Sequence, residues 1–159
     1  MKKGDVGGWI AKGALSHRGD CWVAENAMVS GWARVIDNCL VTGSAQVYNS
    51  ALCAGDSVIA ENAKVFGEAI VTGHATISGD ADVAGTTFVA GTACIRDDTY
   101  TERGIIAGKT ILEGSCQLRG KVDRTKENCK VIDSHFRDRI IDGTKTHIGI
   151  NGCEYLHNR

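Results

Sequence analysis

A six-residue repeat constrains the fold of this chain more than any other feature. From residue 25 to residue 95 the repeat keeps its register without an insertion. Each unit has a turn-forming residue, a small residue two positions later, and a branched or similar apolar residue two positions after that. The first unit shows the pattern with Glu25, Ala27 and Val29, and the next with Gly31, Ala33 and Val35. A fixed period of this kind indicates a repeat architecture.

The spacing within each unit has a physical explanation. Residues two apart on a strand point to the same side, so the small and branched residues face inward together. The chain must bend every six residues, and its 20 glycines supply many of the turn positions, whereas proline is absent. Three such strands close a coil of about 18 residues. The sequence therefore predicts an all-β, left-handed parallel β-helix. The alternative, antiparallel amphipathic strands, would show drifting spacing and hairpin turns of about 2–5 residues.

We predict one domain with three parts. Residues 1–20 depart from the repeat and form an N-terminal cap, in which Trp9 and Ile10 cover the open end of the core. Residues 21–101 form the regular β-helix, and residues 102–159 form irregular coils and a C-terminal cap. The polar segment 96–103 predicts a loop, after which the repeat resumes at Gly108, one residue out of phase. The sequence does not determine the path of residues 96–107 and 120–147.

The seven cysteines predict packing rather than a disulfide framework or a zinc site, because none are in CxxC spacing. Cys21 and Cys39 fall on small inward positions and Cys53 on a branched one, where a thiol acts as a small apolar group. Cys94 points outward, and we expect it to react with a thiol probe. Two further cysteines fit small positions in the less regular part, namely Cys116 and Cys129. No metal and no cofactor is predicted.

The charge balance narrows the range of partners. The formal net charge is −1, whereas nucleic acids and anionic membrane surfaces favour basic patches. No apolar run reaches the length that spans a membrane, and the first residues lack the apolar stretch of a signal peptide. We therefore expect no nucleic-acid or membrane partner, and a location in a reducing, intracellular compartment.

Segments 3–10, 15–17 and 19–23, followed by runs of G-x-A-x-V-x, resemble the YdcK-like hexapeptide-repeat proteins of bacteria and phages. Segment 148–153 is similar to the ending of those proteins, although their longer tail is missing. The family is often labelled transferase by analogy of fold, which says little about function. The resemblance to phage-borne members implies an accessory protein in the bacterial cytoplasm that binds and inhibits a host factor, such as a defence system.

The alternative function is an acyl-CoA-dependent acyltransferase, which needs a histidine as general base. His74 lies at a corner of a regular unit, where no protruding loop walls a pocket, so we expect a solvated residue. His135 and His147 lie in the irregular part, near aspartates that could orient them. The spacing of these three histidines does not suit a shared metal. We therefore favour a non-catalytic role, with these histidines as weak candidates.

The outward positions favour protein binding. Residues at the same position of successive coils stack on one side of the helix and define three outer faces. The first face carries Met28, Gln46, Lys64 and Asp82; the second carries Arg34, Leu52, Ile70 and Phe88; the third carries Trp22, Leu40, Val58, Thr76 and Cys94. The corner that leads into the second face adds Trp32, Tyr48 and Phe66.

Large apolar residues in ladders on two faces indicate an interface. The predicted contact residues are Trp32, Tyr48, Leu52, Phe66, Ile70 and Phe88, with Trp22, Leu40 and Val58. We expect a homo-oligomer, a trimer or a dimer, and possible binding of a host protein. The alternative is that strand propensity alone placed apolar residues outside.

Overall fold

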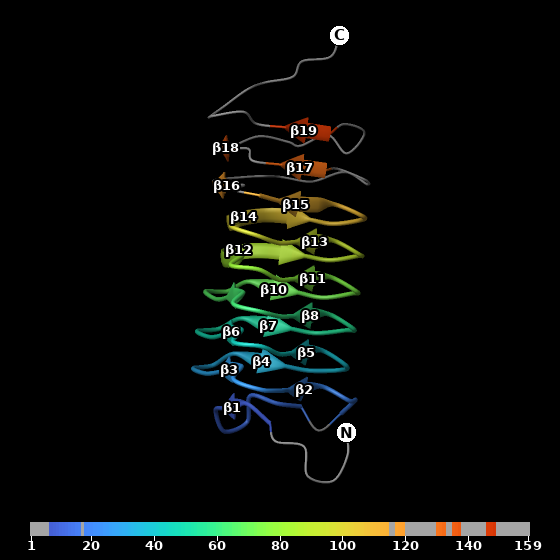
Figure 1. The fold of residues 1–159 in the computed structure, drawn as a ribbon. Coiled ribbons are helices and arrows are strands. Elements are labelled where there is room, and N and C mark those ends of the chain that lie inside the picture. The colour runs from blue at the N-terminus through green and yellow to red at the C-terminus, as the bar shows by residue number, and fades with distance from the viewer. Residues whose placement is uncertain are drawn as a thin grey trace.

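The chain forms a parallel β-helix, as the repeat predicts (Figure 1). The computed structural model describes residues 7–16 and 18–114, and the backbone of four later strands: β16 (Gln117–Arg119), β17 (Lys130–Ile132), β18 (His135–Arg137) and β19 (Thr146–Ile148). Every pairing between the described strands is parallel, and coil follows coil along one axis (Figure 1). Within this described part there is no helix long and apolar enough to cross a membrane.

Short strands build the three faces. The first face contains β1 (Trp9–Ile10), β3 (Met28–Val29), β6 (Gln46–Val47) and β9 (Lys64–Val65); the second contains β4 (Arg34–Val35), β7 (Leu52–Cys53) and β10 (Ile70–Val71). The third contains β2 (Trp22–Val23), β5 (Leu40–Val41), β8 (Val58–Ile59), β11 (Thr76–Ile77), β13 (Cys94–Ile95) and β15 (Ile111–Glu113). Two longer strands, β12 (Asp82–Val89) and β14 (Tyr100–Ile106), run from the first face into the second and join them into one sheet.

The inward positions form the core, and the assignment of side chains to inside or outside is confirmed for residues 25–95. Val29, Val47 and Val65 are register partners in successive coils and stack with almost no exposure. The small residues that precede them, such as Ala45 and Ala63, are fully buried near the corners. The core is thus a column of aliphatic layers, one from each coil.

The corners require a left-handed backbone. Glu25, Asp37, Asn49, Glu61 and Asp97 adopt positive φ, between 56° and 62°, although they are not glycine. At the corner between the second and third faces, glycines lie on glycines: a Cβ on Gly73 would lie 2.8 Å from the carbonyl oxygen of Gly91. Only glycine fits both the backbone conformation and this close approach.

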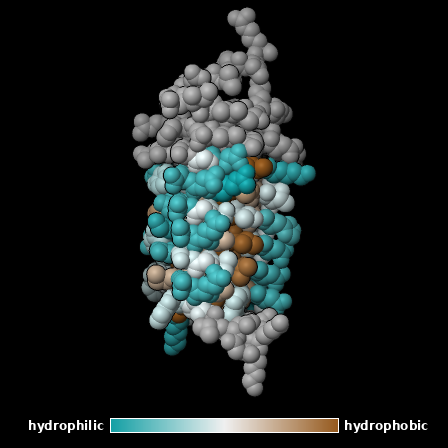
Figure 2. Space-filling model, in the orientation of Figure 1, coloured by the Kyte–Doolittle hydropathy of each residue, from teal (hydrophilic) through white to brown (hydrophobic). Residues whose placement is uncertain are grey.

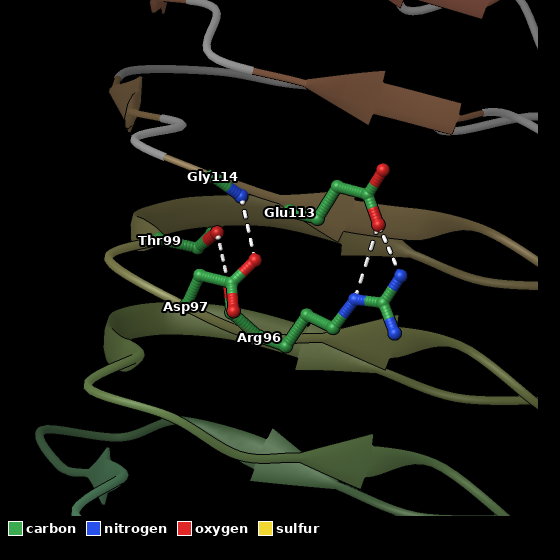
Figure 3. A network of polar contacts seen from close by, with 5 residues as sticks. All are labelled: Arg96, Asp97, Thr99, Glu113 and Gly114. Carbon is green, nitrogen blue, oxygen red and sulfur yellow. Dashed lines mark hydrogen bonds and ion pairs between the residues drawn. The ribbon is translucent and has the colours of Figure 1, made fainter.

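Acidic corner residues also bind the next coil, which the repeat alone does not reveal. The amide of Gly43 donates to Oε2 of Glu25 at 2.6 Å, and the amide of Gly55 donates to Oδ2 of Asp37 at 3.1 Å. Glu61 and Asp97 accept in the same way from Gly79 and Gly114. Figure 3 shows the Asp97 contact beside the ion pair of Arg96 with Glu113. An acid at a turn position, with glycine at the same position of the next coil, is the sequence signal for this contact.

Hydroxyl residues replace alanine at some small inward positions. Each of them donates to the carbonyl oxygen three residues earlier, at 2.7–2.8 Å: Ser57 to Ala54, Thr87 to Ala84, Thr99 to Arg96 and Thr110 to Ala107. The corner thus provides the acceptor that a buried hydroxyl needs.

The loop prediction for residues 96–103 is wrong for its second half. Residues from Tyr100 onward form β14, and Asp97, Thr99 and Thr101 take the turn, small and branched positions of one more unit. Polar composition suggests a loop, but threonine is β-branched and suits a strand. Hydrogen bonding of the Thr99 hydroxyl to Arg96 makes its burial possible.

One residue is missing from the coil that ends in β14. Val83 pairs with Thr101, a full coil later, whereas Thr86 pairs with Arg103, which lies one position short of a full coil. The register therefore shifts where β12 passes Ala84 and Gly85. This shift explains why the repeat resumes at Gly108 out of phase. It also turns Ile106 into the core and Ile105 outward.

The expected role of Trp9 is wrong as well. Its side chain is 75% exposed, and it stands in register with the outward Met28 rather than over the core. Ile10 is 39% exposed. Ala11, Ala14 and Leu15 pack against the end of the core instead. The first coil thus closes the core with smaller aliphatic side chains and leaves the tryptophan in solvent.

Candidate protein interface

The second face carries an unbroken apolar ladder. Leu52, Ile70 and Phe88 are direct register partners on β7, β10 and β12, and Ile105 continues the ladder on β14. Phe88 and Ile105 are 37% and 38% exposed, and Leu52 and Ile70 are half-buried. Arg34 ends the ladder below. The sequence prediction missed Ile105, because the one-residue shift hides its register.

Aromatic residues flank this ladder at the corner between the first and second faces. The rings of Tyr48 and Phe66 stack with centroids 4.9 Å apart and an interplanar angle of 4°. Both are half-buried, whereas Trp32, one coil below, is 84% exposed. Stacking orders the rings of Tyr48 and Phe66 in the absence of a partner. The predicted aromatic corner thus consists of this stacked pair and the exposed indole of Trp32.

The third face is less uniform. Its ladder runs from Trp22 through Leu40 and Val58 to Thr76 and Cys94. All five are half-buried. The polar Thr76 interrupts the apolar run. A Cβ built on Gly7 would lie 3.4 Å from the Trp22 ring, so the chain at Gly7 already approaches that ring. The second face is thus the better candidate interface.

From Gln46 to Asp82 the first face is polar and gives the aromatic corner a charged border. Lys64 Nζ lies 3.9 Å from Oδ1 of Asp82 on the next coil. Burial raises the pKa of the Asp82 carboxyl, against the opposing effect of Lys64. Burial, and then the charge of Asp82, raise the pKa of Tyr48, so this tyrosine is a neutral hydrogen-bonding group. The apolar ladder therefore has one well-defined polar edge.

The surface of the protein carries a narrow apolar strip. On the side visible in Figure 2, hydrophobic residues gather in a column parallel to the helix axis, with hydrophilic residues on both sides. An apolar strip bordered by polar residues is the usual form of a protein interface.

The catalytic alternative gains little from the geometry of His74. Its Nδ1 lies 3.4 Å from Oδ2 of Asp56, one coil below. The two side chains are 68% and 51% exposed, on an open corner. A base of this kind has a carboxylate to orient it but no surrounding residues to exclude water or hold an acyl donor. The expectation of a solvated corner residue is confirmed.

His135 and His147 do not share a face. His135 lies on β18, in register with Gln117 of the 11-stranded sheet, and His147 lies on β19, in register with Val131 of the 8-stranded sheet. Their side chains, and Asp133, Asp138 and Asp142, lie outside the described residues. In the described part, no three histidine, cysteine or acidic side chains meet as a metal site.

The four described cysteines occupy the positions that the repeat predicts. Cys21, Cys39 and Cys53 are buried, and Cys94 is the one that points outward among the cysteines of the described part. Cys94 is only partly exposed, and burial raises the pKa of its thiol. Its reaction with a probe is therefore slower than that of an open thiol. Cys116 and Cys129 lie outside the described residues.

Comparison of the chain with protein-family models finds no match, and no curated protein matches it. The resemblance to YdcK-like proteins therefore stays a prediction.

Proposed function

We propose that this protein is a non-catalytic binding scaffold whose second face docks a protein surface, first of all that of a second copy. The observation that carries the proposal is the ladder of Leu52, Ile70, Phe88 and Ile105 on a rigid frame. The strand pairing fixes the backbone beneath each side chain, so little backbone entropy is lost on binding.

The free energy gained by burying the ladder can be compared with the cost of association. Full burial of such a side chain stabilises by about 1.5–3 kcal/mol, and these side chains are already partly buried, so each adds roughly 1 kcal/mol. With four from each of two copies, the side chains give about 8 kcal/mol, whereas association costs about 4–15 kcal/mol. The ladders alone therefore only roughly balance the cost of association. The aromatic corner of Trp32, Tyr48 and Phe66 must contribute, which fits the role of aromatics as main contributors at interfaces.

A second copy is the favoured occupant because its rungs have the same spacing. Coils stack at about 4.8 Å. Two ladders with that common spacing can interdigitate along their whole length, which a surface of unrelated spacing cannot do. An inhibited host protein, as the family resemblance implies, is the other occupant that we propose for the same face.

Two differently tagged copies test the first occupant. Co-expressed tagged chains should co-purify through either tag, and Ile70→Asp in both should abolish this, because a buried carboxylate opposes docking. Gln46→Asp on the polar first face is the matched control and should change nothing. Co-purification that survives Ile70→Asp would exclude the second face as the contact. If no copies associate, mass spectrometry of proteins captured from bacterial lysate by wild type but not by Ile70→Asp tests the host partner.

A further inference from the structure

The two ends of the second face differ in charge, and this difference constrains how a second copy can dock. The central column of the face has one outward residue from each coil: Arg34, Leu52, Ile70, Phe88 and Ile105. Arg34 is exposed and has no ion pair within the described part of the chain. The column therefore begins with an uncompensated positive charge and continues with four apolar rungs.

Two copies with parallel helix axes would bring like charges together. If the two-fold axis runs along the helix axis, each rung of the column lies opposite the same rung of the second copy. Arg34 would then face Arg34, and like charges that face each other across an interface oppose binding. An antiparallel arrangement instead moves the two arginines to opposite ends of the pair.

All four apolar rungs are covered when the two-fold axis of an antiparallel pair passes midway between Ile70 and Phe88. Ile70 then lies opposite Phe88 of the second copy. Leu52 lies opposite Ile105 in the same way. A register shifted by one coil would move either Arg34 onto Ile105 or Leu52 past it. The midway register therefore gives the pair a fully apolar centre, as stable interfaces have.

The same register makes the corner between the first and second faces complementary to itself. In an antiparallel pair this corner of one copy lies against the same corner of the other. The column just before the turn runs through Tyr48, Phe66, Ala84 and Glu102. Phe66 then lies opposite the small Ala84 of the second copy, and the hydroxyl of Tyr48 lies opposite Glu102, whose carboxylate can accept its hydrogen bond.

Charges on the column just after the turn are complementary as well. This column is exposed along its whole length and runs through Trp32, Ser50, Glu68, Thr86 and Arg103. Glu68 lies opposite Thr86 of the second copy, so Arg103 of that copy is one coil away, about 4.8 Å along the axis. Among the described residues neither Glu68 nor Arg103 has an ion pair of its own. Two Glu68–Arg103 pairs can thus border the apolar centre.

We propose that two copies dock through their second faces as an antiparallel pair, with Ile70 of each copy opposite Phe88 of the other. This inference rests on the proposed self-association and adds its orientation, its register and its number of chains. A two-fold contact of this kind is closed, because each copy covers the docking face of the other. The assembly therefore contains two chains and not three.

Reversal of the charges at Glu68 and Arg103 tests the register. Glu68→Arg alone places two arginines at each of the two contacts and should weaken the pair by about tenfold, since exposed ion pairs are individually weak. Glu68→Arg with Arg103→Glu in one chain recreates both ion pairs, so its dissociation constant should return to within about twofold of wild type. Glu68→Arg with Arg34→Glu is the matched control. It has the same net charge but keeps the facing arginines, and it should stay about tenfold weaker.

Light scattering over a dilution series measures both the dissociation constant and the number of chains, and circular dichroism checks that each variant is folded. Wild type should reach the mass of two chains. A wild type that stays a single chain at every concentration would overturn the self-association together with its orientation. A mass of three chains would overturn only the antiparallel arrangement. So would a Glu68→Arg/Arg103→Glu variant that binds as weakly as Glu68→Arg.

Discussion

Thr99 and Thr101 lie two residues apart, both face the core, and they differ in the fate of their hydroxyl groups. Thr99 Oγ1 donates to the carbonyl oxygen of Arg96 at 2.8 Å. Thr101 Oγ1 is buried and has no hydrogen-bond partner among the described residues. Thr99 sits at the small position beside the corner, where a carbonyl is within reach. Thr101 takes the branched position, which valine or isoleucine fills in most other coils.

This difference predicts opposite effects of the same substitution. Thr101→Val should raise the free energy of unfolding by about 1 kcal/mol, because it removes a buried unsatisfied hydroxyl without changing shape. Thr99→Val should lower it by about 1 kcal/mol, because it removes a satisfied one. Urea unfolding followed by circular dichroism measures both. A lower stability of Thr101→Val would mean that its hydroxyl has a partner.

The stacked glycines at the corner between the second and third faces predict that a substitution there is costly. Gly73→Ala should lower the free energy of unfolding by about 3 kcal/mol, from left-handed strain and the contact with Gly91. Gly13 has a similar φ of 80° but nothing within 4 Å of its Cβ position. Gly13→Ala should therefore cost only about 1 kcal/mol. Equal costs in thermal unfolding would contradict the close approach between coils.

Asp82 predicts a pH-dependent effect. Its carboxyl pKa is raised above 3.8 in the folded protein, chiefly by burial. A raised acid pKa means that the folded state prefers the protonated form, so stability is lost as pH rises from 3.8 through the folded pKa. Asp82→Asn should thus be more stable than wild type at pH 7, by about 0.5 kcal/mol. The difference should vanish at pH 3, and an advantage that persists there would point to another cause.

Because no residues enclose a pocket beside His74, we predict that an acyl donor does not change the Tm of the protein. Acetyl-CoA at millimolar concentration should leave Tm unchanged within about 1 °C, since a ligand stabilises a protein only by binding its folded state. Thermal shift with desulfo-CoA as a control detects any specific site. A rise of several degrees would favour the acyltransferase alternative.

The sequence predicts most of the fold because the period fixes the position of each residue. Alternation places Val47 inside and Gln46 outside without further information. The prediction fails where a rule of composition competes with the period. The polar segment before Ile105 has the composition of a loop, yet its threonines occupy core positions.

Part of the candidate interface could not be predicted, for physical reasons. Ile105 and Ile106 are adjacent, so the sequence does not tell which one faces outward, and the register shift beside Gly85 decides it. The stacking of Tyr48 on Phe66 depends on ring rotamers, which a period does not specify. The size of Trp9 suggests a place over the core, whereas its register with Met28 turns it outward.

If the second face docks a second copy, the molar mass in solution must exceed that of one chain. Light scattering after size exclusion should give wild type and Gln46→Asp a mass of two or three chains, and Ile70→Asp the 16.9 kDa of one chain. Melting curves by circular dichroism should match for all three. A wild type that elutes as one chain, or an Ile70→Asp variant that keeps the mass of wild type, would contradict the account.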